Sequence, residues 1–394
     1  MDILYVSYFC EQQYFKKIFN TAIIKPAQAP QKYHRLMVEG LTKNGANVLC
    51  LTGRPITTRT HSKKIWKGEV EICDSVKYKY IPFINYGPLK HLFYLFFSFF
   101  YTLFWCISRK DKAVVLDILC APIAKGSALA GRLCGTTVNG IVTDLPEMIN
   151  FDNRDYGFFN SLSNRLSVSP IKLCTQYTVL TAQMLDVVNP HGKPFTIVEG
   201  LADFNMSDRP RVFPTDGKHH ICYMGQIYEQ FGVKSLVEAF MSVKNEDCIL
   251  DIFGPGPMAE MMPGYMEKDH RIVYHGCVSM EESVAAQLSA YILVNPRPTS
   301  EEFTKYSFPS KNIEYMASGA PLLTTCLPGM PKEYYDYVFL FEEESVEGMS
   351  KTLNNILKMS EEDVQLKGQR GKEFVLSQKN NIVQAEKLYR LLTL

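Results

Sequence analysis

The feature that most constrains the fold of this chain is an alternation of short apolar runs with longer amphipathic segments, which continues from one end to the other. The apolar runs have the length of β-strands, and the segments between them repeat their apolar positions with the period of an α-helix. Strands that alternate with helices in this way are typical of βαβ units around parallel sheets. The sequence therefore predicts an α/β fold.

Length and a break in the pattern indicate two domains. The 394 residues exceed the ~250 to 300 at which one hydrophobic core usually stops growing. The alternation stops near Gly200, and residues 202–218 are rich in Asp, Pro, Arg and Ser without a sustained period. We predict two Rossmann-like domains, in residues 1–203 and 204–376, which would face each other across a cleft where parallel sheets bind ligands. Residues 377–394 would form a C-terminal helix, and packing back on the N-terminal domain is one option for it.

The expected elements follow from the apolar runs and their periods. In the first half we expect strands at 3–7, 46–52, 113–116, 137–143 and 177–181, and helices at 31–44 and 124–134. In the second half we expect strands at 220–224, 249–253, 272–274, 291–295 and 321–325, and helices at 233–243, 280–289, 310–317 and 382–392.

The net charge and the cysteine content indicate which partners and which cellular compartment to expect. The formal net charge of +1 excludes a generally polycationic surface, so we expect no nucleic-acid partner. The 11 cysteines form no C-x-x-C pair, and several lie inside apolar runs, which indicates reduced, buried thiols. Residues 1–6 lack the basic start of a signal peptide and match a first strand. We therefore expect a cytoplasmic protein.

The most informative segment, 295–319, consists of a strand end, a polar loop and a helix that begins at Ser310. The N–H groups and the dipole at a helix start favour an anion such as a diphosphate. Lys311 lies at this start and Arg297 follows the strand, so these two cations could neutralise a pyrophosphate without a metal ion. Glu314 could accept hydrogen bonds from ribose hydroxyls. Plainer interpretations stay open, with Ser310 as an N-cap, Glu314 as a complement to the dipole and both cations solvated.

Four motifs occur together in the second half. They are Tyr-Met-Gly-Gln at 223–226 with the helix that follows it, Leu-Asp-Ile-Phe-Gly-Pro-Gly at 250–256, His-Gly at 275–276, and Phe-Pro-Ser-Lys-Asn-Ile-Glu at 308–314. In order and spacing they resemble glycosyltransferase family 4, whose members are retaining enzymes of the GT-B fold. The resemblance covers nearly the whole chain and is strongest over 223–325.

The resemblance implies how a nucleotide diphosphate sugar would bind. The phosphates would contact Gly225, Arg297, Ser310 and Lys311, and the ribose and base would contact Glu314, Gly254, Pro255 and Gly256. In such enzymes positioned donors and cations stabilise the leaving diphosphate, while the acceptor approaches the same face of the sugar. The sequence has no Asp-x-Asp and no His cluster at ligand spacing, so we expect neither a metal ion nor another cofactor.

Three positions depart from the pattern of the family. The first glutamate of the family's paired motif corresponds to Tyr306, and its usual arginine and lysine correspond to Gln226 and Phe231. We expect Arg297 and Lys311 to replace the missing cations. The donor sugar would instead meet Glu302, which is also a catalytic candidate, with Phe303, Thr304, Lys305, Tyr306 and Ser307. The chain looks like a polysaccharide-biosynthesis subgroup of the family, which implies a role in the synthesis of capsule or lipopolysaccharide.

Asp144 is the catalytic candidate of the N-terminal domain. It follows a predicted strand, so its carboxylate would lie at a strand end facing the cleft and act as a base or charge stabiliser. An Asp before a Leu-Pro pair is also a common turn element, and both interpretations stay open. Gln31, Lys32 and His34 open the first long helix and would either contact acceptor or phosphate or form polar surface.

Two segments predict contact with a membrane. Residues 92–107 are apolar on every side, and as a helix of about 24 Å they fall short of the ~30 Å hydrocarbon core, so we expect no span. Their aromatic residues suit an interfacial helix as well as a buried crossover helix. Residues 54–67 are basic with one tryptophan and no acid, as in a loop on anionic headgroups or in a solvated loop. We expect peripheral attachment on the cytoplasmic face and a lipid-linked saccharide acceptor.

The predicted function is that of a retaining glycosyltransferase. Two alternatives stay open, a nucleotide-sugar epimerase of the same fold and a non-catalytic protein that binds a nucleotide sugar or a membrane. A nicotinamide oxidoreductase would need a G-x-G-x-x-G turn after a strand, and the first strand is followed by Tyr-Phe-Cys-Glu-Gln instead.

Overall fold

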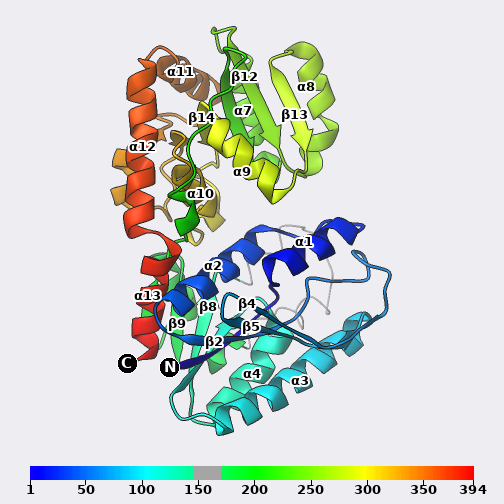
Figure 1. Ribbon diagram of the computed structural model, residues 1–394. Helices are drawn as coiled ribbons and strands as arrows, with labels where there is room; N and C mark the ends of the chain where they lie inside the picture. The colour runs from blue at the N-terminus through cyan, green and yellow to red at the C-terminus, as the bar shows by residue number, and fades with distance from the viewer. Residues whose placement is uncertain (146–169) are drawn as a thin grey trace. The chain divides into compact units, whose positions relative to one another are not determined.

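The structure, a computed structural model, describes residues 1–145 and 170–394. Contacts within the chain divide it into two compact units, unit 1 with residues 1–199 and 381–394, and unit 2 with residues 200–380. Each unit has a main sheet of parallel strands with helices beside it (Figure 1). The predicted α/β class is confirmed. The divisions fall after Glu199 and before Asn381, where the sequence predicts boundaries after residues 203 and 376.

The main sheet of unit 1 has the strand order β10-β9-β8-β7-β1-β2-β5-β4, and β3 pairs with β6 in a small separate sheet. The strands are β1 Asp2–Ser7, β2 Asn47–Thr52, β3 Ile65–Trp66, β4 Glu69–Cys73, β5 Val76–Tyr80, β6 Phe83–Ile84, β7 Lys112–Asp117, β8 Thr137–Val142, β9 Gln176–Val179 and β10 Phe195–Ile197. The helices are α1 Gln12–Thr21, α2 Ala29–Lys43, α3 Gly87–Ile107, α4 Ala121–Leu133, α6 Leu185–Val188 and α13 Asn381–Leu392. The central strand β1 is buried on both faces, which explains its continuous apolar run.

The antiparallel hairpin of β4 and β5 is an element that the sequence analysis missed. Its two-residue turn, Asp74 and Ser75, has positive φ at both positions (46° and 69°), as a type I′ turn requires. Strand β4 lies at the edge of the sheet and exposes most of its residues. Val70 and Ile72 alternate with Glu69 and Glu71, so the signal of a strand was present in the sequence.

The terminal helix α13 belongs to unit 1, where it packs on α2 and β10. Asn44 donates a hydrogen bond to the carbonyl oxygen of Ile382 at 2.8 Å, and Gln176 donates to that of Leu391 at 3.0 Å. The residues that follow the second unit thus complete the core of the first.

Helices α3 and α4 pack closely because α4 has a glycine at their contact. A Cβ on Gly126 would lie 2.2 Å from the carbonyl oxygen of Leu95 and 2.3 Å from the hydroxyl of Ser98. One position further on, Thr102 donates a buried hydrogen bond to Ser127 at 2.9 Å. Helix α3 has 21 residues, about 31 Å at 1.5 Å per residue, so the length argument against a membrane span is wrong.

Arg54 corrects the prediction of an exposed basic segment at 54–67. Its side chain is fully buried, lies over the rings of Tyr14 and Tyr80, and pairs with Glu69 at 3.2 Å. The aromatic rings and the carboxylate compensate the positive charge of the buried guanidinium. Arg54 therefore cannot contact lipid headgroups. The remaining basic side chains of the segment are exposed, namely Arg59, Lys63, Lys64 and Lys67.

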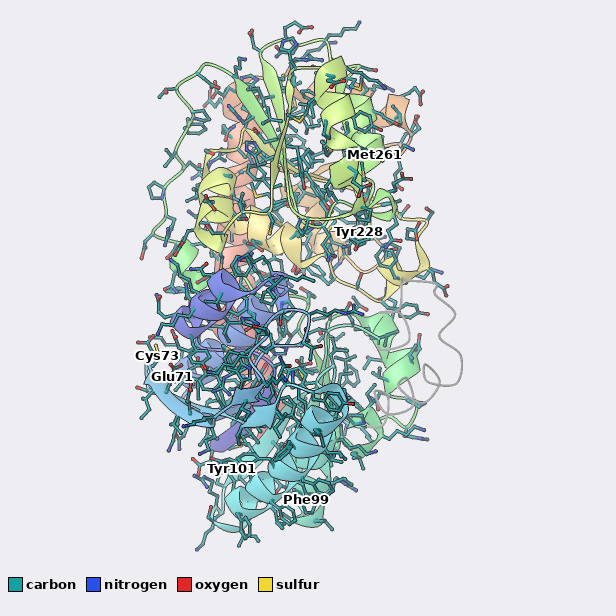
Figure 2. All side chains as sticks on the ribbon, turned by 90° about the vertical axis from the view of Figure 1, so that its right-hand side faces the viewer. Glu71, Cys73, Phe99, Tyr101, Tyr228 and Met261 are labelled. Atoms are coloured by element: carbon teal, nitrogen blue, oxygen red, sulfur yellow. The ribbon has the colours of Figure 1, made fainter. Side chains whose placement is uncertain are left out.

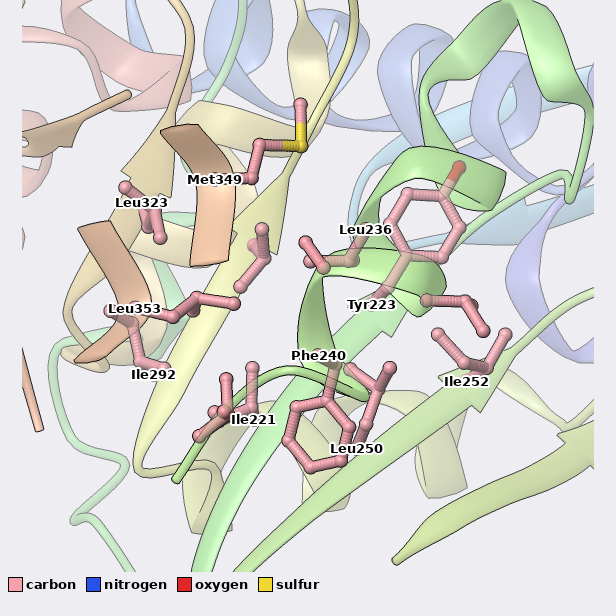
Figure 3. Close-up of a cluster of buried hydrophobic side chains, with 14 of the residues drawn as sticks. Ile221, Tyr223, Leu236, Phe240, Leu250, Ile252, Ile292, Leu323, Met349 and Leu353 are labelled. Carbon is pink, nitrogen blue, oxygen red and sulfur yellow. The ribbon is translucent and has the colours of Figure 1, made fainter. Parts of the chain in front are cut away.

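The sheet of unit 2 is parallel and has the order β13-β12-β11-β14-β15-β16. Its strands are β11 His219–Met224, β12 Cys248–Phe253, β13 Ile272–Gly276, β14 Ile292–Asn295, β15 Leu322–Thr324 and β16 Phe339–Leu340. Its helices are α7 Val233–Phe240, α8 Met262–Lys268, α9 Met280–Ser289, α10 Ser310–Ser318, α11 Val346–Ile356 and α12 Glu361–Gln378. Figure 3 shows the core on one face of this sheet, where strand residues meet α7 and α11 through Ile221, Leu250, Leu236, Phe240 and Leu353.

Replacing Gly126 by alanine should lower the stability of unit 1 by about 1 to 3 kcal/mol, the usual cost of overpacking. The new Cβ would push against backbone of α3, so the helices must separate. Both tryptophans, Trp66 and Trp105, lie in unit 1, so tryptophan fluorescence during a urea titration reports on this unit. Gly87→Ala is the matched control, because no atom lies within 4 Å of its Cβ position. Equal midpoints for Gly126→Ala and the wild type would contradict the packing argument.

Candidate functional site

Helix α10 begins at the carboxyl edge of the unit 2 sheet, and buried hydrogen bonds fix it there. The hydroxyl of Tyr315 donates to the carbonyl oxygen of Met224 and accepts from the N–H of the same residue, both at 2.8 Å. The side chain of Asn312 accepts from Asn295 at 2.7 Å and donates to Thr324 at 3.3 Å. Met224, Asn295 and Thr324 are the last residues of β11, β14 and β15. The first turn of α10 is therefore held at the ends of three strands.

The N-cap of α10 is not Ser310, the residue that the sequence offered for this position. Pro309 occupies the N-cap position, and Ser310 is the first helical residue with an exposed side chain. Within the described residues, no side chain accepts a hydrogen bond at this cap. The interpretation of Ser310 as the N-cap is therefore wrong, and the dipole at the helix start remains available to an anion.

The side chain of Lys311 occupies the space that Gly225 leaves. Its Nζ is 3.2 Å from the hydroxyl of Tyr223 and 4.8 Å from the centroid of that ring. A Cβ on Gly225 would lie 1.7 Å from the same nitrogen. Burial and the charge of Arg297 lower the pKa of Lys311 to about 7, while Glu314 acts in the opposite direction. A cation in this position gains strongly from a nearby negative charge.

Arg297 is oriented by two aromatic rings. The centre of its guanidinium is 5.0 Å from the ring centroid of Phe231 and 5.3 Å from that of Phe303. Its carbonyl oxygen accepts a hydrogen bond from Thr325 at 2.6 Å, which holds the backbone after β14. Phe231 is thus an aromatic platform for a cation at a position where the family pattern has a cation itself.

The glycine turns after the strands lie against one another. The N–H of Gly225 donates to the carbonyl oxygen of Phe253 at 2.9 Å, and that of Gly254 donates to Gly276 at 2.7 Å. A Cβ on Gly254, whose φ is +127°, would lie 1.8 Å from the carbonyl oxygen of Gly225. The turn therefore requires glycine, and Pro255 beyond it is exposed.

A buried carboxylate supports the last of these turns. Asp251 on β12 is 2.6 Å from Nε2 of His275 and 2.6 Å from Nδ1 of His220. Burial alone would raise the pKa of Asp251, but the two histidines hold it below its usual range. The imidazole of His275 also stacks on Phe253, with 4.2 Å between the ring centroids. These contacts fix the edge strand β13 just before Gly276.

Glu314 lies one turn into α10 on the side of α9. Gln287 of α9 donates a hydrogen bond to its Oε1 at 3.3 Å. The carboxylate of Glu314 is only partly buried. Its exposed part lies on the same helix as Lys311, and the role of a ribose ligand stays a prediction.

The loop before α10 contains the residues predicted to meet a sugar. Glu302–Lys305 form a 3-10 turn, in which the buried hydroxyl of Thr304 donates to the carbonyl oxygen of Glu301 at 2.6 Å. The side chain of Thr304 thus stabilises the loop. The hydroxyl of Ser307 is buried without a hydrogen-bond partner in the described part of the chain. The side chains with exposed surface are Glu302, Phe303, Lys305 and Tyr306.

In unit 1, the predicted candidates are one exposed side chain, one half-buried side chain, that of Lys32, and two buried side chains. Asp144 is exposed and lies two residues after β8. Gln31 is buried and holds the loop after β1, because it donates to the carbonyl oxygen of Tyr8 at 2.8 Å and accepts from the N–H of Cys10 at 3.0 Å. The prediction that Gln31 and His34 face a ligand or solvent is therefore wrong.

His34 takes part in a buried network that the sequence analysis missed. Its Nε2 is 3.0 Å from Asp117, and its Nδ1 is 2.7 Å from the hydroxyl of Tyr5. Ser7 and Cys120 also donate to the same carboxylate, at 2.8 Å and 3.0 Å. Burial would raise the pKa of Asp117, but His34 and these donors hold it below its usual range. Polar residues at the ends of two predicted strands were the signal available in the sequence.

Sequence reasoning also missed the residues that support the unit 2 site. Tyr315 appeared only as an apolar helix position, and Tyr223 only as a strand residue. Phe231 appeared as a departure from the family pattern rather than as a ring beneath Arg297. Each contact joins residues far apart in the sequence, so no local pattern contains it.

Comparison with known proteins identifies the fold and the class of unit 2. Residues 218–359 match the family described as "Glycosyl transferases group 1". This range lies within unit 2, so this unit contains a glycosyltransferase domain, and the predicted enzyme class is confirmed. No curated protein sequence matches the chain. Membership of family 4 and of a polysaccharide-biosynthesis subgroup stays a prediction.

Solved structures match both units. The chain is similar over 100% of its length to 99% of sucrose-phosphate synthase from Thermosynechococcus elongatus, with a TM-score of 0.70 and 15% identity. It is similar over 99% of its length to 99% of WaaG, a glycosyltransferase involved in lipopolysaccharide biosynthesis, with a TM-score of 0.63 and 14% identity. It is similar over 100% of its length to 100% of Anabaena HepE in complex with UDP, with a TM-score of 0.62 and 10% identity. These similarities confirm the predicted GT-B fold.

The affinity for a nucleoside diphosphate should fall as the pH rises from about 7.5 to about 9. Lys311, with a pKa of about 7, is mostly unprotonated in the free protein throughout this range, whereas a phosphate with a second pKa of about 6 no longer titrates. Because an anion favours the charged ammonium, binding restores the proton, and the affinity drops by up to about tenfold per pH unit. Titration calorimetry measures this slope. Lys311→Met should bind more weakly with a flat profile, and a flat wild-type profile would contradict the assignment.

Proposed function

We propose that this protein is a retaining glycosyltransferase that moves a sugar from a nucleotide diphosphate sugar, bound by unit 2, to a saccharide acceptor. The observation that carries the proposal is the meeting of Arg297, Lys311 and the start of α10 at the ends of three parallel strands. This edge is where parallel sheets bind ligands. A diphosphate has the charge and the oxygen atoms to engage both cations and the helix start at once.

The two cations suit the charge that develops in the reaction. When the bond from the anomeric carbon to the β-phosphate oxygen breaks, the diphosphate takes the electron pair and gains a negative charge. Arg297 and Lys311 would stabilise it from fixed positions, which is the usual source of a large part of enzymatic rate. We propose that these side chains carry the phosphate charge and that no metal ion or other cofactor is needed.

The remaining donor contacts follow from the same edge. Glu314 would accept from the ribose hydroxyls, and the turn of Gly254, Pro255 and Gly256 would lie at the base. Gly225 supports the assignment because it leaves room for the ammonium of Lys311 beside the phosphates. Glu302, with the exposed residues of its loop, would contact the sugar in place of the family's first glutamate.

The acceptor is proposed from unit 1 and from the chain's structural relatives. Asp144 is an exposed carboxylate beyond β8, and we assign it the role of the base or charge stabiliser near the acceptor hydroxyl. WaaG acts in lipopolysaccharide biosynthesis. With the apolar segment 92–107, this favours a lipid-linked saccharide acceptor in surface polysaccharide synthesis on the cytoplasmic face of a membrane.

Nucleoside diphosphates and their sugars should raise the melting temperature of the wild type in a thermal-shift panel. Lys311→Met and Glu314→Ala should each weaken binding by about 10- to 100-fold, because a hydrogen bond to a charged group contributes roughly 1.5 to 3 kcal/mol. Lys351→Met is the matched control, since Lys351 is an exposed lysine on α11. A wild type that no nucleotide stabilises, or variants that respond as the wild type does, would remove the donor-site assignment.

Asp144→Asn should lower turnover by about 10²- to 10⁴-fold, the usual contribution of a general acid or base, while the nucleotide affinity stays unchanged. Turnover is measured as release of nucleoside diphosphate in the presence of acceptor saccharides. Wild-type turnover in the variant would contradict the catalytic role and favour the interpretation of Asp144 as a turn residue. Epimerisation or hydrolysis of the donor without any acceptor would favour the epimerase alternative, and nucleotide binding without turnover would favour the non-catalytic one.

A further inference from the structure

Helix α3 exposes a continuous apolar stripe. Its members recur at the spacing of one helix face and are between 42% and 69% exposed, namely Leu89, Leu92, Phe93, Phe96, Phe100, Phe104 and Ile107. On the neighbouring helix, Leu129 and Leu133 lie one turn apart and are also exposed. Soluble proteins rarely leave an apolar surface of this extent uncovered. We call these nine residues the α3–α4 ridge.

The opposite face of α3 is committed to unit 1. Tyr94, Ser98, Thr102, Trp105 and Cys106 are buried. Figure 1 shows α3 and α4 side by side. Figure 2 shows the same region from the side, with Phe99 and Tyr101 labelled on α3.

This packing argues against a membrane-spanning α3, although the helix is long and apolar enough to cross a bilayer. A span would pull Ser98 away from Gly126 and break the buried hydrogen bond from Thr102 to Ser127. Unpaired hydroxyls and the polar edge of the unit would then enter the hydrocarbon. Helix α3 can therefore meet a bilayer only along its exposed stripe, with its axis in the plane of the interface.

The charges around the ridge identify its partner. The sequence has no Asp or Glu between residues 75 and 110 or between 118 and 143. At the C-terminal ends of the two helices, Lys110 and Arg132 are exposed cations, whereas Arg109 pairs with Asp2 at 3.3 Å. The exposed carboxylate of Asp111 at the same end is 3.3 Å from the amino group of Met1. Lys90 does not contribute, because its ammonium lies over the rings of Phe83 and Tyr94, and burial lowers its pKa to about 8. A second copy docked through the same two helices would bring the same cations and no acid from either helix, whereas anionic headgroups would pair with Lys110 and Arg132.

We propose that the α3–α4 ridge is a docking surface for an anionic bilayer, with the apolar stripe in the interface and the cations of the two helix ends against the headgroups. This inference rests on the proposed function in one respect: a lipid-linked acceptor is the reason why the protein would bind a membrane. The side chains that enter the bilayer are those of α3 and α4. The proposal does not use the segment 54–67, whose Arg54 is buried within unit 1.

Sedimentation with vesicles tests the proposal. The full chain should co-sediment with vesicles of equal parts phosphatidylglycerol and phosphatidylcholine, and less with phosphatidylcholine alone or in high salt, which screens the headgroup charge. The double variant Phe96→Glu, Phe100→Glu should lower the vesicle partition coefficient at least about tenfold, because it puts two charges into the apolar stripe. Phe195→Glu is the matched control, since Phe195 is 46% exposed on β10 outside the ridge. It should bind vesicles as the wild type does.

The outcomes separate this surface from the donor site. All variants should keep the wild-type thermal shift with nucleoside diphosphate. This result would show that they are folded and that their donor site is intact, so the donor site and the membrane surface are tested independently. A wild type that stays in the supernatant would overturn the proposal, as would a double variant that binds like the wild type. A wild-type dimer in analytical ultracentrifugation that the double variant makes monomeric, without vesicle binding, would assign the ridge to a second copy instead.

Discussion

The candidate site depends on one buried hydroxyl, that of Tyr315, which both donates to and accepts from the backbone of Met224. An isolated nine-residue helix such as α10 would be unstable in water, so its place is set by what it packs against. Tyr315 ties it to the last residue of β11, and Asn312 ties it to the last residues of β14 and β15. The cation of Lys311 and the helix dipole therefore point to the same edge of the sheet.

The electrostatics of this edge support the proposal that the chain can differ from the pattern of family 4 and still bind a diphosphate. Lys311 and Arg297 are close enough that the charge of one lowers the pKa of the other. Such repulsion costs free energy in the empty site, and an anion between the two cations removes that cost. Phe231 stands where the family has a cation, yet it contributes by holding Arg297 in place through its ring.

In unit 1, helix α3 has one face buried in the protein and one face exposed. The buried face of α3 fits α4 because Gly126 removes a side chain at their contact, and the exposed face presents aromatic residues on a helix that contains no acid. The buried hydrogen bonds among His34, Asp117 and Tyr5 also fix an element in place, because they join strands β1 and β7 to helix α2. In both places a polar or small residue fixes the position of an element whose apolar residues provide the stability.

The sequence by itself determined the α/β class, the positions of most parallel strands and of helices α2, α4, α7, α9, α10 and α13, and the motif that carries Lys311 and Glu314, because apolar period and helix-start chemistry are local properties. It did not predict α1, α11 or α12. It could not show that Gln31, His34, Thr304 and Arg54 are buried. Those features depend on which distant segments pack together. Only the tertiary structure decided them, since burial and hydrogen-bond partners arise between residues that are neighbours in space and not in the chain.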